Sequence, residues 1–261
     1  MGEKVTEKSR KKKIWIIILI IALLCVITSA SYFIYLKIES DKMDDFKDEV
    51  TVSTDDTSSA EPEVETPVDF KKLKKQNPDI YAWINIPGMV IDYPILRNPN
   101  NDRFYLTHSV DLKKSKYGAI YTHNYNDMEF NDFNTVVYGH NMRNGTMFGS
   151  LKKFRDNTFF EQNRYINIYM PGRILKYEIF AAYVFDDRHI LLNFDFSDIN
   201  VRKEYLDMIF STRKVSANIK HDIAVTENDK IITLSTCTSN DNERYLVQGV
   251  LIYDSREQFG S

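Results

Sequence analysis

The chain of 261 residues contains only two cysteines, and they lie in segments of very different character. Cys25 lies inside a long apolar run, whereas Cys237 follows a strand-like apolar segment near the C-terminal end. With one thiol in the remaining chain, no disulfide can form within that part. A solitary cysteine in an exported domain indicates either a reactive thiol or a buried inert one, and both readings stay open at this point.

The chain also lacks clustered metal ligands and a strong excess of charge. Its five histidines show no ligand-like spacing to one another or to Cys237, and no group of carboxylates indicates a calcium site. The net charge of -3 gives no basic field of the kind that gathers nucleic acid. We therefore expect no metal, no other cofactor and no nucleic-acid partner.

A long hydrophobic run is present near the N-terminus. Residues 14–36 contain no charged side chain, and about 20 apolar residues suffice for a helix to cross a bilayer. Basic residues precede the run, and such flanks are retained in the cytoplasm. The pattern predicts a single-pass signal anchor in the cell membrane, with a cytoplasmic N-terminus and an extracellular domain. A signal peptide cleaved near Ser31 is the alternative, although its apolar region usually has only about 7–15 residues.

Composition divides the chain into four parts. Residues 1–13 form the basic cytoplasmic tail, and residues 14–36 form the anchor. Residues 37–68 are acidic and polar and lack apolar periodicity, which is typical of an extracellular linker. A short helix is expected to continue into residues 37–50 of this linker. Residues 69–261 are expected to form the folded domain.

The folded part is mainly β, because β-branched and aromatic runs dominate it. Helices are expected over residues 70–76, where Asp69 can serve as the N-cap, over residues 146–155 and over residues 197–212. Long helices do not alternate with the strands, so the pattern favours an antiparallel barrel or sandwich over a doubly wound sheet. The predicted strands cover residues 81–86, 89–96, 118–122, 135–138, 165–170, 174–185, 230–236 and 245–253.

Strand periodicity groups the candidate site residues. Side chains two positions apart share a face, which groups Ser235 with Cys237 and Tyr138 with His140. Only six residues separate Cys237 from Arg244, so a tight connection would hold both at one end of neighbouring antiparallel strands. Thiol, imidazole and guanidinium are sufficient for acyl transfer. Each also has an ordinary structural reading, and spacing alone does not bring His140 to Cys237.

Two motifs carry a resemblance to a known family. Thr233-Leu234-Ser235-Thr236-Cys237 followed by Arg244, with Val137-Tyr138-Gly139-His140-Asn141-Met142 upstream, resembles the signature of sortases. Residues 77–88 and 91–94 resemble the entry to class B sortases in particular. The predicted helix over residues 197–212 also fits the helix that class B adds before the cysteine strand. The resemblance covers roughly residues 69–261.

The resemblance implies a fold and a chemistry. Sortases are membrane-anchored cysteine transpeptidases of Gram-positive bacteria, with an eight-stranded β-barrel, an N-terminal helix and, here, a helix before the last two strands. By motif match, Cys237 is the nucleophile, His140 the general acid and Arg244 the oxyanion or substrate stabiliser. Tyr138 and Ser235 would line the groove for the sorting signal.

The implied partners are surface proteins and the cell wall. Cys237 would cleave an LPXTG-like or NPXTN-like signal after its threonine and form a thioacyl-enzyme. An amine of a peptidoglycan cross-bridge, or of its lipid-linked precursor, would then receive the surface protein.

Some features depart from the family pattern or leave alternatives open. The loop after Cys237 is short for class B, and Thr238-Ser239 stands where some members carry an acidic residue, so substrate selectivity is open. His123 stands where relatives often have a carboxylate, and we expect it to be structural or surface-exposed. Another wall-active cysteine peptidase or transpeptidase remains an alternative, although the Ser-His-Gly-Cys arrangement of L,D-transpeptidases is absent. A catalytically silent membrane-anchored binding module is the second alternative.

Overall fold

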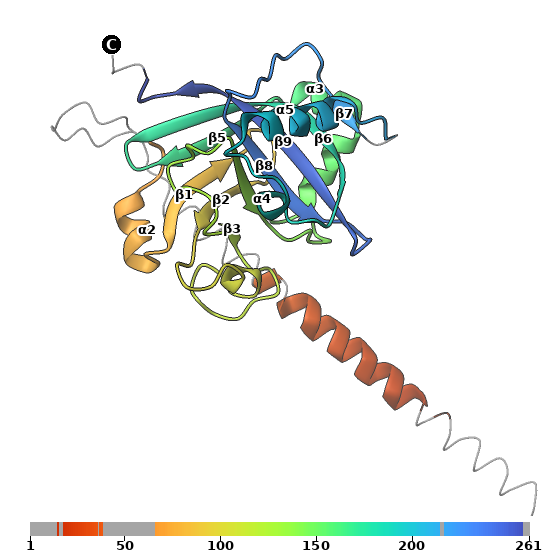
Figure 1. The fold of residues 1–261 in the computed structure, drawn as a ribbon. Coiled ribbons are helices and arrows are strands. Elements are labelled where there is room, and N and C mark those ends of the chain that lie inside the picture. The colour runs from red at the N-terminus through yellow and green to blue at the C-terminus, as the bar shows by residue number, and fades with distance from the viewer. Residues whose placement is uncertain (1–14, 16–17, 36, 39–65, 215–216, 258–261) are drawn as a thin grey trace, which may run out of the picture. The chain divides into compact units, whose positions relative to one another are not determined.

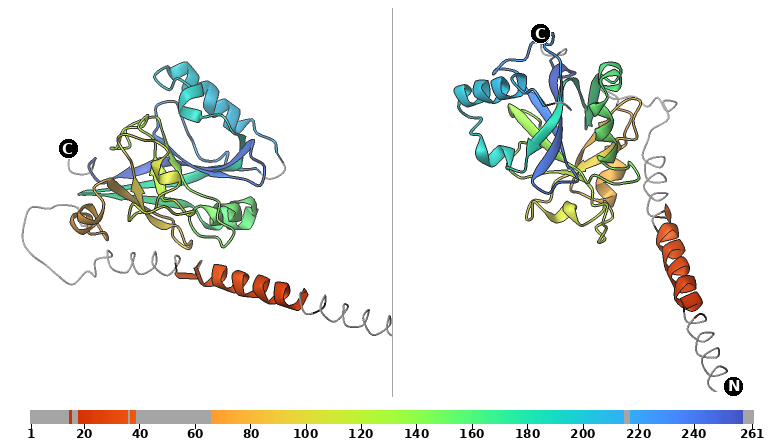
Figure 2. Two further views of the ribbon diagram at one scale, coloured as in Figure 1. Left: turned by 90° about the horizontal axis from the view of Figure 1, so that it is seen from below. Right: turned by 90° about the vertical axis from the view of Figure 1, so that its right-hand side faces the viewer.

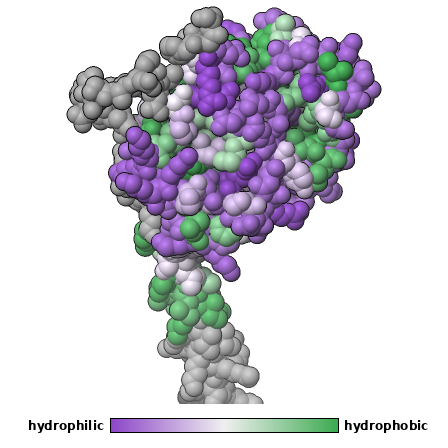
Figure 3. Space-filling view, turned by 60° about the vertical axis from the view of Figure 1, so that its left-hand side comes forward, coloured by the Kyte–Doolittle hydropathy of each residue, from purple (hydrophilic) through white to green (hydrophobic). Residues whose placement is uncertain are grey.

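The computed structural model describes residue 15 and residues 18–35, 37–38, 66–214 and 217–257. The chain divides into two units, Met1–Glu49 and Val50–Ser261. In the first unit the described residues are helical, and Ile18–Tyr35 is long and apolar enough to cross a membrane. Hydrophobic side chains are exposed along this helix (Figure 3). The basic tail and most of the predicted linker, including the helix expected into residues 37–50 beyond position 38, lie outside the described residues.

The second unit is built around a closed β-sheet (Figure 1). Its strands follow the order β5-β1-β2-β3-β4-β8-β9-β6, and β6 pairs again with β5, which closes an eight-stranded barrel. A short strand β7 extends the sheet beside β6. The predicted eight-stranded barrel is therefore confirmed. The strands are β1 (Ile80–Asn85), β2 (Asp92–Leu96), β3 (Ile120–Thr122), β4 (Asn134–Tyr138), β5 (Tyr165–Met170), β6 (Arg173–Asp186), β7 (Asn218–Ile219), β8 (Ile231–Cys237) and β9 (Glu243–Asp254).

Two strand pairs in the barrel are parallel, which the sequence analysis did not predict. β2 pairs with β3 and β4 pairs with β8 in parallel, whereas the other pairs are antiparallel. Parallel neighbours require long connections, so their pairing joins segments far apart in the chain. The β4–β8 pair places Tyr138 opposite Ser235 and thereby brings the two predicted motifs together.

The helices confirm two of the three sequence predictions and correct the third. Asp69 caps α2 (Phe70–Gln76) by accepting a hydrogen bond from the Lys72 amide. α5 (Ile199–Phe210) lies within the predicted range. The helix expected over residues 146–155 is only the 3-10 helix η2 (Gly149–Arg155), because Met147 has a φ of 53°, which no right-handed helix accommodates. The sequence analysis did not foresee η1 (Phe104–Leu106), α3 (Asn157–Gln162) and α4 (Ile190–Asn193).

Burial along β6 explains the position of α5. The first residues of β6 alternate between buried and partly buried, as expected of a strand with one covered face. Residues 179–183 are all buried, and Phe180, Ala181 and Tyr183 belong to a hydrophobic cluster that includes Tyr205, Leu206 and Ile209 of α5. Figure 2 shows α5 on the outside of the barrel, on the side away from α2.

Candidate active site

Cys237 and Arg244 lie opposite each other at one end of the β8–β9 pair. Their Cα atoms are partners in the antiparallel register, as the spacing predicts. The connection stays tight because the Thr238 hydroxyl accepts a hydrogen bond from the Asn240 amide at 3.0 Å. Cys237 is exposed and Arg244 is partly buried, so both side chains are accessible to a ligand.

The guanidinium of Arg244 is held by its own loop. Its Nη1 donates to the carbonyl oxygens of Asp241 at 2.8 Å and of Glu243 at 2.9 Å. Both bonds are made by this one nitrogen, and they reduce the rotamer freedom that binding would otherwise have to restrict. A positioned cation therefore lies beside the strand end that carries the thiol.

His140 follows β4 after one glycine. The end of β4 is tied to β8, since the Gly139 amide donates to the Ser235 carbonyl at 3.2 Å and the Thr236 hydroxyl donates to the Gly139 carbonyl at 2.7 Å. The Nε2 atom of His140 lies 2.6 Å from the carbonyl oxygen of Leu106. Because a carbonyl only accepts, Nε2 carries a hydrogen, and Nδ1 is the nitrogen left to exchange a proton.

Asn141 is a site residue to which sequence reasoning assigned no role. Its Nδ2 donates to the backbone carbonyl of Cys237 at 2.8 Å and links the segment after β4 to the cysteine. The only sequence signal was its place directly after His140 in the quoted motif. Nothing in the spacing indicates which carbonyl it would contact.

One cavity of about 390 Å³ contains all five predicted site residues in its wall. Tyr138, His140, Ser235, Cys237 and Arg244 come from β4, from the segment after it, and from β8 and β9. The structure thus brings the five residues together, whereas their roles remain predictions.

Two histidines that are distant in the sequence form a pair in the same cavity wall. His123 Nδ1 lies 2.8 Å from His189 Nε2, and the ring of His123 stacks on Tyr138 with centroids 4.4 Å apart. His123 is only 8% exposed, so a surface position for it is wrong. Burial, followed by the proximity of His189, lowers the pKa of His123 to about 4. The pair therefore carries no charge at neutral pH.

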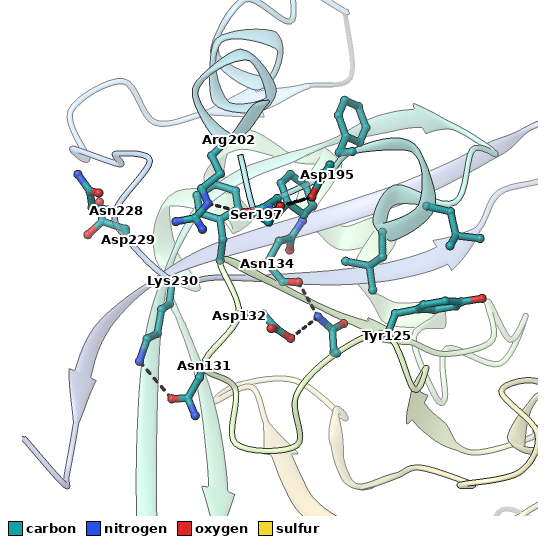
Figure 4. A pocket seen from close by; sticks show the side chains of 16 residues that line it. Tyr125, Asn131, Asp132, Asn134, Asp195, Ser197, Arg202, Asn228, Asp229 and Lys230 are labelled. Atoms are coloured by element: carbon teal, nitrogen blue, oxygen red, sulfur yellow. Dashed lines mark hydrogen bonds between the residues drawn. The ribbon is translucent and has the colours of Figure 1, made fainter. Parts of the chain in front are cut away.

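A larger cavity of about 590 Å³ lies between the β3–β4 loop, the α4–α5 segment and the loop before β8 (Figure 4). Internal hydrogen bonds already engage several of its polar groups: Arg202 Nε with the Phe196 carbonyl, the Ser197 hydroxyl with Asp195, and Lys230 Nζ with Asn131. Among the residues that the structure describes, no group of three or more histidine, cysteine or acidic side chains is placed to hold a metal ion. The wall of this cavity contains no cysteine, whereas the wall of the smaller cavity contains Cys237.

Comparison with known proteins identifies relatives of this chain. The sequence profile of the Sortase domain matches residues 84–252. The Sortase B of Listeria monocytogenes is 33% identical over 213 residues, which cover 80% of this chain and 83% of that protein.

Solved structures extend the likeness to the fold. The Clostridium perfringens sortase B is 35% identical with a TM-score of 0.64, and the match covers 71% of this chain and all of that one. The Bacillus anthracis sortase B, solved in complex with AAEK1, is 29% identical with a TM-score of 0.70, and the match covers 84% of this chain and 99% of that one. The chain therefore belongs to the sortase family of cysteine transpeptidases and, within it, to class B.

Proposed function

We propose that this sortase cleaves an LPXTG-like or NPXTN-like C-terminal sorting signal after its threonine and transfers the surface protein to a peptidoglycan amine. The observation that carries the proposal is the shared cavity, in which Cys237, His140 and Arg244 meet at one end of the barrel. That cavity lies at the surface, as a site must for a peptide segment of another protein.

The first half-reaction uses the three residues in distinct roles. The Cys237 thiolate attacks the carbonyl carbon of the threonine, and the resulting oxyanion is stabilised by the guanidinium of Arg244. The carbon–nitrogen bond then breaks, and the leaving amine takes a proton from Nδ1 of His140, since Nε2 is engaged with the Leu106 carbonyl. A thioester between the threonine carbonyl and Cys237 remains.

The second half-reaction releases the product. An amine of the cross-bridge, or of its lipid-linked precursor, attacks the thioester and loses a proton to His140, and the Cys237 thiolate leaves. Tyr138 and Ser235 lie in the cavity wall and would contact the sorting signal. Neither half-reaction requires an oxidant, reductant or metal.

Localisation belongs to the same proposal. The apolar helix Ile18–Tyr35 fits a single-pass membrane anchor. We place the basic N-terminal tail in the cytoplasm and the catalytic domain, residues 69–261, outside the cell, because basic flanks are retained inside.

The proposal is tested with the full chain in nanodiscs and a panel of fluorogenic sorting peptides. Cleavage after threonine by the wild type, with a trapped acyl-enzyme in the mass spectrum that Cys237→Ala lacks, would support it. A wild type that forms no adduct and cleaves none of the threonine-containing signals would contradict it. Adducts with peptides that lack a sorting signal would instead favour a general wall-active cysteine peptidase.

A further inference from the structure

The loop before β3 and the helix α2 are both rich in lysine. Residues 69–79 and 107–117 together contain seven lysines and three aspartates, in a chain whose net charge is -3. The two segments are in contact, because Asn77 at the end of α2 donates to the Val110 carbonyl at 2.8 Å. Figure 1 and Figure 2 show them adjacent in each view. We define the basic face as Leu112 together with five exposed lysines of the two segments: Lys71, Lys74, Lys75, Lys114 and Lys116. Lys113 is also exposed, but its ammonium is paired with the Asp111 carboxylate at 2.8 Å.

Leu112 distinguishes the basic face from an ordinary solvated surface. It is 49% exposed at the tip of the loop and has a φ of 62°, a region that leucine rarely adopts. The tip is held in this shape, since the Leu112 amide donates to the Ser109 carbonyl at 3.0 Å and the Ser109 amide donates to the Lys113 carbonyl at 2.9 Å. The backbone therefore presents an apolar side chain outward between charged neighbours.

This combination fits the interface of a lipid bilayer. Ammonium groups approach the phosphates of anionic headgroups, while an apolar side chain enters the region between headgroups and acyl chains. A soluble anion would use the lysines alone and would gain nothing from an exposed leucine. The chemistry of the basic face therefore favours an anionic membrane surface over a dissolved polyanion.

The connection between the apolar helix and the domain is long enough for the basic face to reach the membrane. Residues 39–65, which join the apolar helix to the first described residues of the domain, number 27. A chain of this length spans at most about 95 Å, at about 3.5 Å per residue. Tethering raises the effective concentration of the membrane at the domain, so weak contacts suffice for docking.

The loop that carries the basic face also reaches the candidate active site. A Cβ atom on Gly118 would lie 2.5 Å from the Tyr105 carbonyl and 3.0 Å from Cδ2 of His140, which shows how closely the loop end packs there. The Leu106 carbonyl, just before the loop, contacts His140 Nε2. A contact at the basic face would therefore be made by the same segment that forms part of the cavity wall.

We propose that the basic face docks the catalytic domain onto anionic phospholipids of the membrane that its own apolar helix enters. Docking holds the cavity around Cys237 near the bilayer, where a lipid-linked amine would be found. The inference rests on the proposed membrane anchor and not on the sorting signal, so it can fail while peptide cleavage is observed.

Hydrogen–deuterium exchange of the full chain in nanodiscs tests this docking. We compare discs of phosphatidylcholine with discs that also contain phosphatidylglycerol. Residues 70–76 and 107–117 are expected to exchange several-fold more slowly in the anionic discs, and 0.5 M salt should abolish the difference. Residues 199–210 of α5, on the other side of the barrel, should exchange equally in both discs.

Two variants separate docking from effects on folding. Lys71→Gln/Lys74→Gln/Lys75→Gln should lose the protection, because each lysine near an anionic surface contributes about fivefold in affinity. Lys152→Gln/Lys153→Gln/Lys203→Gln removes three exposed lysines from η2 and α5 and should retain the protection. Leu112→Gly should weaken the protection without lowering thermal stability, because glycine adopts a φ of 62° readily.

Three results would overturn the proposal. The first is equal exchange in the two kinds of disc, and the second is equal loss of protection in both lysine variants. The third is slower exchange of the two segments with a soluble polyphosphate but not with anionic discs. That result would indicate that the basic face binds an anionic wall polymer. Sorting-peptide cleavage by the same samples shows separately whether the proposed function holds.

Discussion

Arg244 is the residue of the candidate site whose side chain the backbone fixes most directly. Its Nη1 donates to the carbonyls of Asp241 and Glu243, and the planar guanidinium has further N–H donors on its other nitrogens, which an ammonium lacks. Arg244→Ala is expected to lower kcat by about 100- to 1000-fold, the usual effect of removing one oxyanion donor.

The measurement is steady-state cleavage of a sorting peptide. Arg244→Lys should recover only part of the rate, and Arg213→Ala, which removes an exposed arginine at the end of α5, should leave it unchanged. A kcat of Arg244→Ala close to that of the wild type would exclude the oxyanion role.

The His123–His189 pair should make stability depend on pH. The folded state lowers the pKa of His123 to about 4, below its ordinary value near 6.5, so the unfolded chain binds more protons between these values. Stability is therefore complete above about pH 6.5 and declines as the pH falls toward 4. Protonating both rings would also place two N–H donors face to face across the 2.8 Å contact.

Thermal unfolding between pH 4 and pH 7 checks this dependence. After allowance for solvent, the pair should account for about 1 kcal/mol, or roughly 3 °C in Tm for a domain of this size. His123→Asn should flatten the Tm profile over this range, whereas His221→Asn, at an exposed histidine, should not. An unchanged slope in His123→Asn would show that other groups cause the acid sensitivity.

Local patterns predicted one part of the site and missed another. Strand parity and a short loop were enough to place Ser235, Cys237 and Arg244, because these relations involve neighbouring residues. His123 and His189 are 66 positions apart and lie in segments with no shared pattern. Their contact depends on how the start of α4 meets the segment after β3, which no local spacing encodes.

At the scale of elements, a buried polar network joins α5 to the barrel. Gln248 Nε2 of β9 donates to the Tyr205 hydroxyl at 2.9 Å and to the Thr233 hydroxyl at 2.8 Å. All three residues are fully buried. Removing one partner from a buried network of this kind destabilises the fold, because the group left behind cannot form a hydrogen bond with water instead.

Tyr205→Phe is expected to lower the free energy of unfolding by about 1–2 kcal/mol, since Gln248 loses an acceptor inside the core. Urea unfolding followed by circular dichroism measures the change. Tyr125→Phe, at a tyrosine that is 54% exposed, should change stability by less than about 0.5 kcal/mol. Equal effects of the two substitutions would mean that the network does not stabilise the α5 packing.

The sequence predicted most strands within a few residues, because alternation and β-branched runs report on local burial. It could not predict that β4 pairs in parallel with β8, since pairing between distant strands depends on the closure of the whole barrel. The helix predicted over residues 146–155 was wrong for a local reason. The positive φ of Met147 delays the helical turn, and methionine gives no signal of such a conformation.

At the scale of the whole molecule, chemical labelling of the two cysteines can determine the orientation of the chain in the membrane. Cys25 lies in the apolar helix, whereas Cys237 is exposed at the end of β8. With the N-terminus in the cytoplasm, a membrane-impermeant maleimide should label Cys237 on intact cells that carry a cell wall permeable to the reagent. Cys25 should react slowly, because a membrane-impermeant reagent does not enter the apolar interior of a bilayer.

The assay includes its own positional controls. Cys237→Ala should abolish labelling of intact cells, and Ser9→Cys in that background should be labelled only after lysis, because Ser9 lies in the basic tail before the anchor. The reverse pattern, with Ser9→Cys labelled on intact cells and Cys237 only after lysis, would contradict the proposed orientation. It would also remove the peptidoglycan amine from reach of the site, since the thioester would then form on the cytoplasmic side. Labelling at Cys237 alone on intact cells would instead place the proposed nucleophile on the same side of the membrane as the proposed wall acceptor.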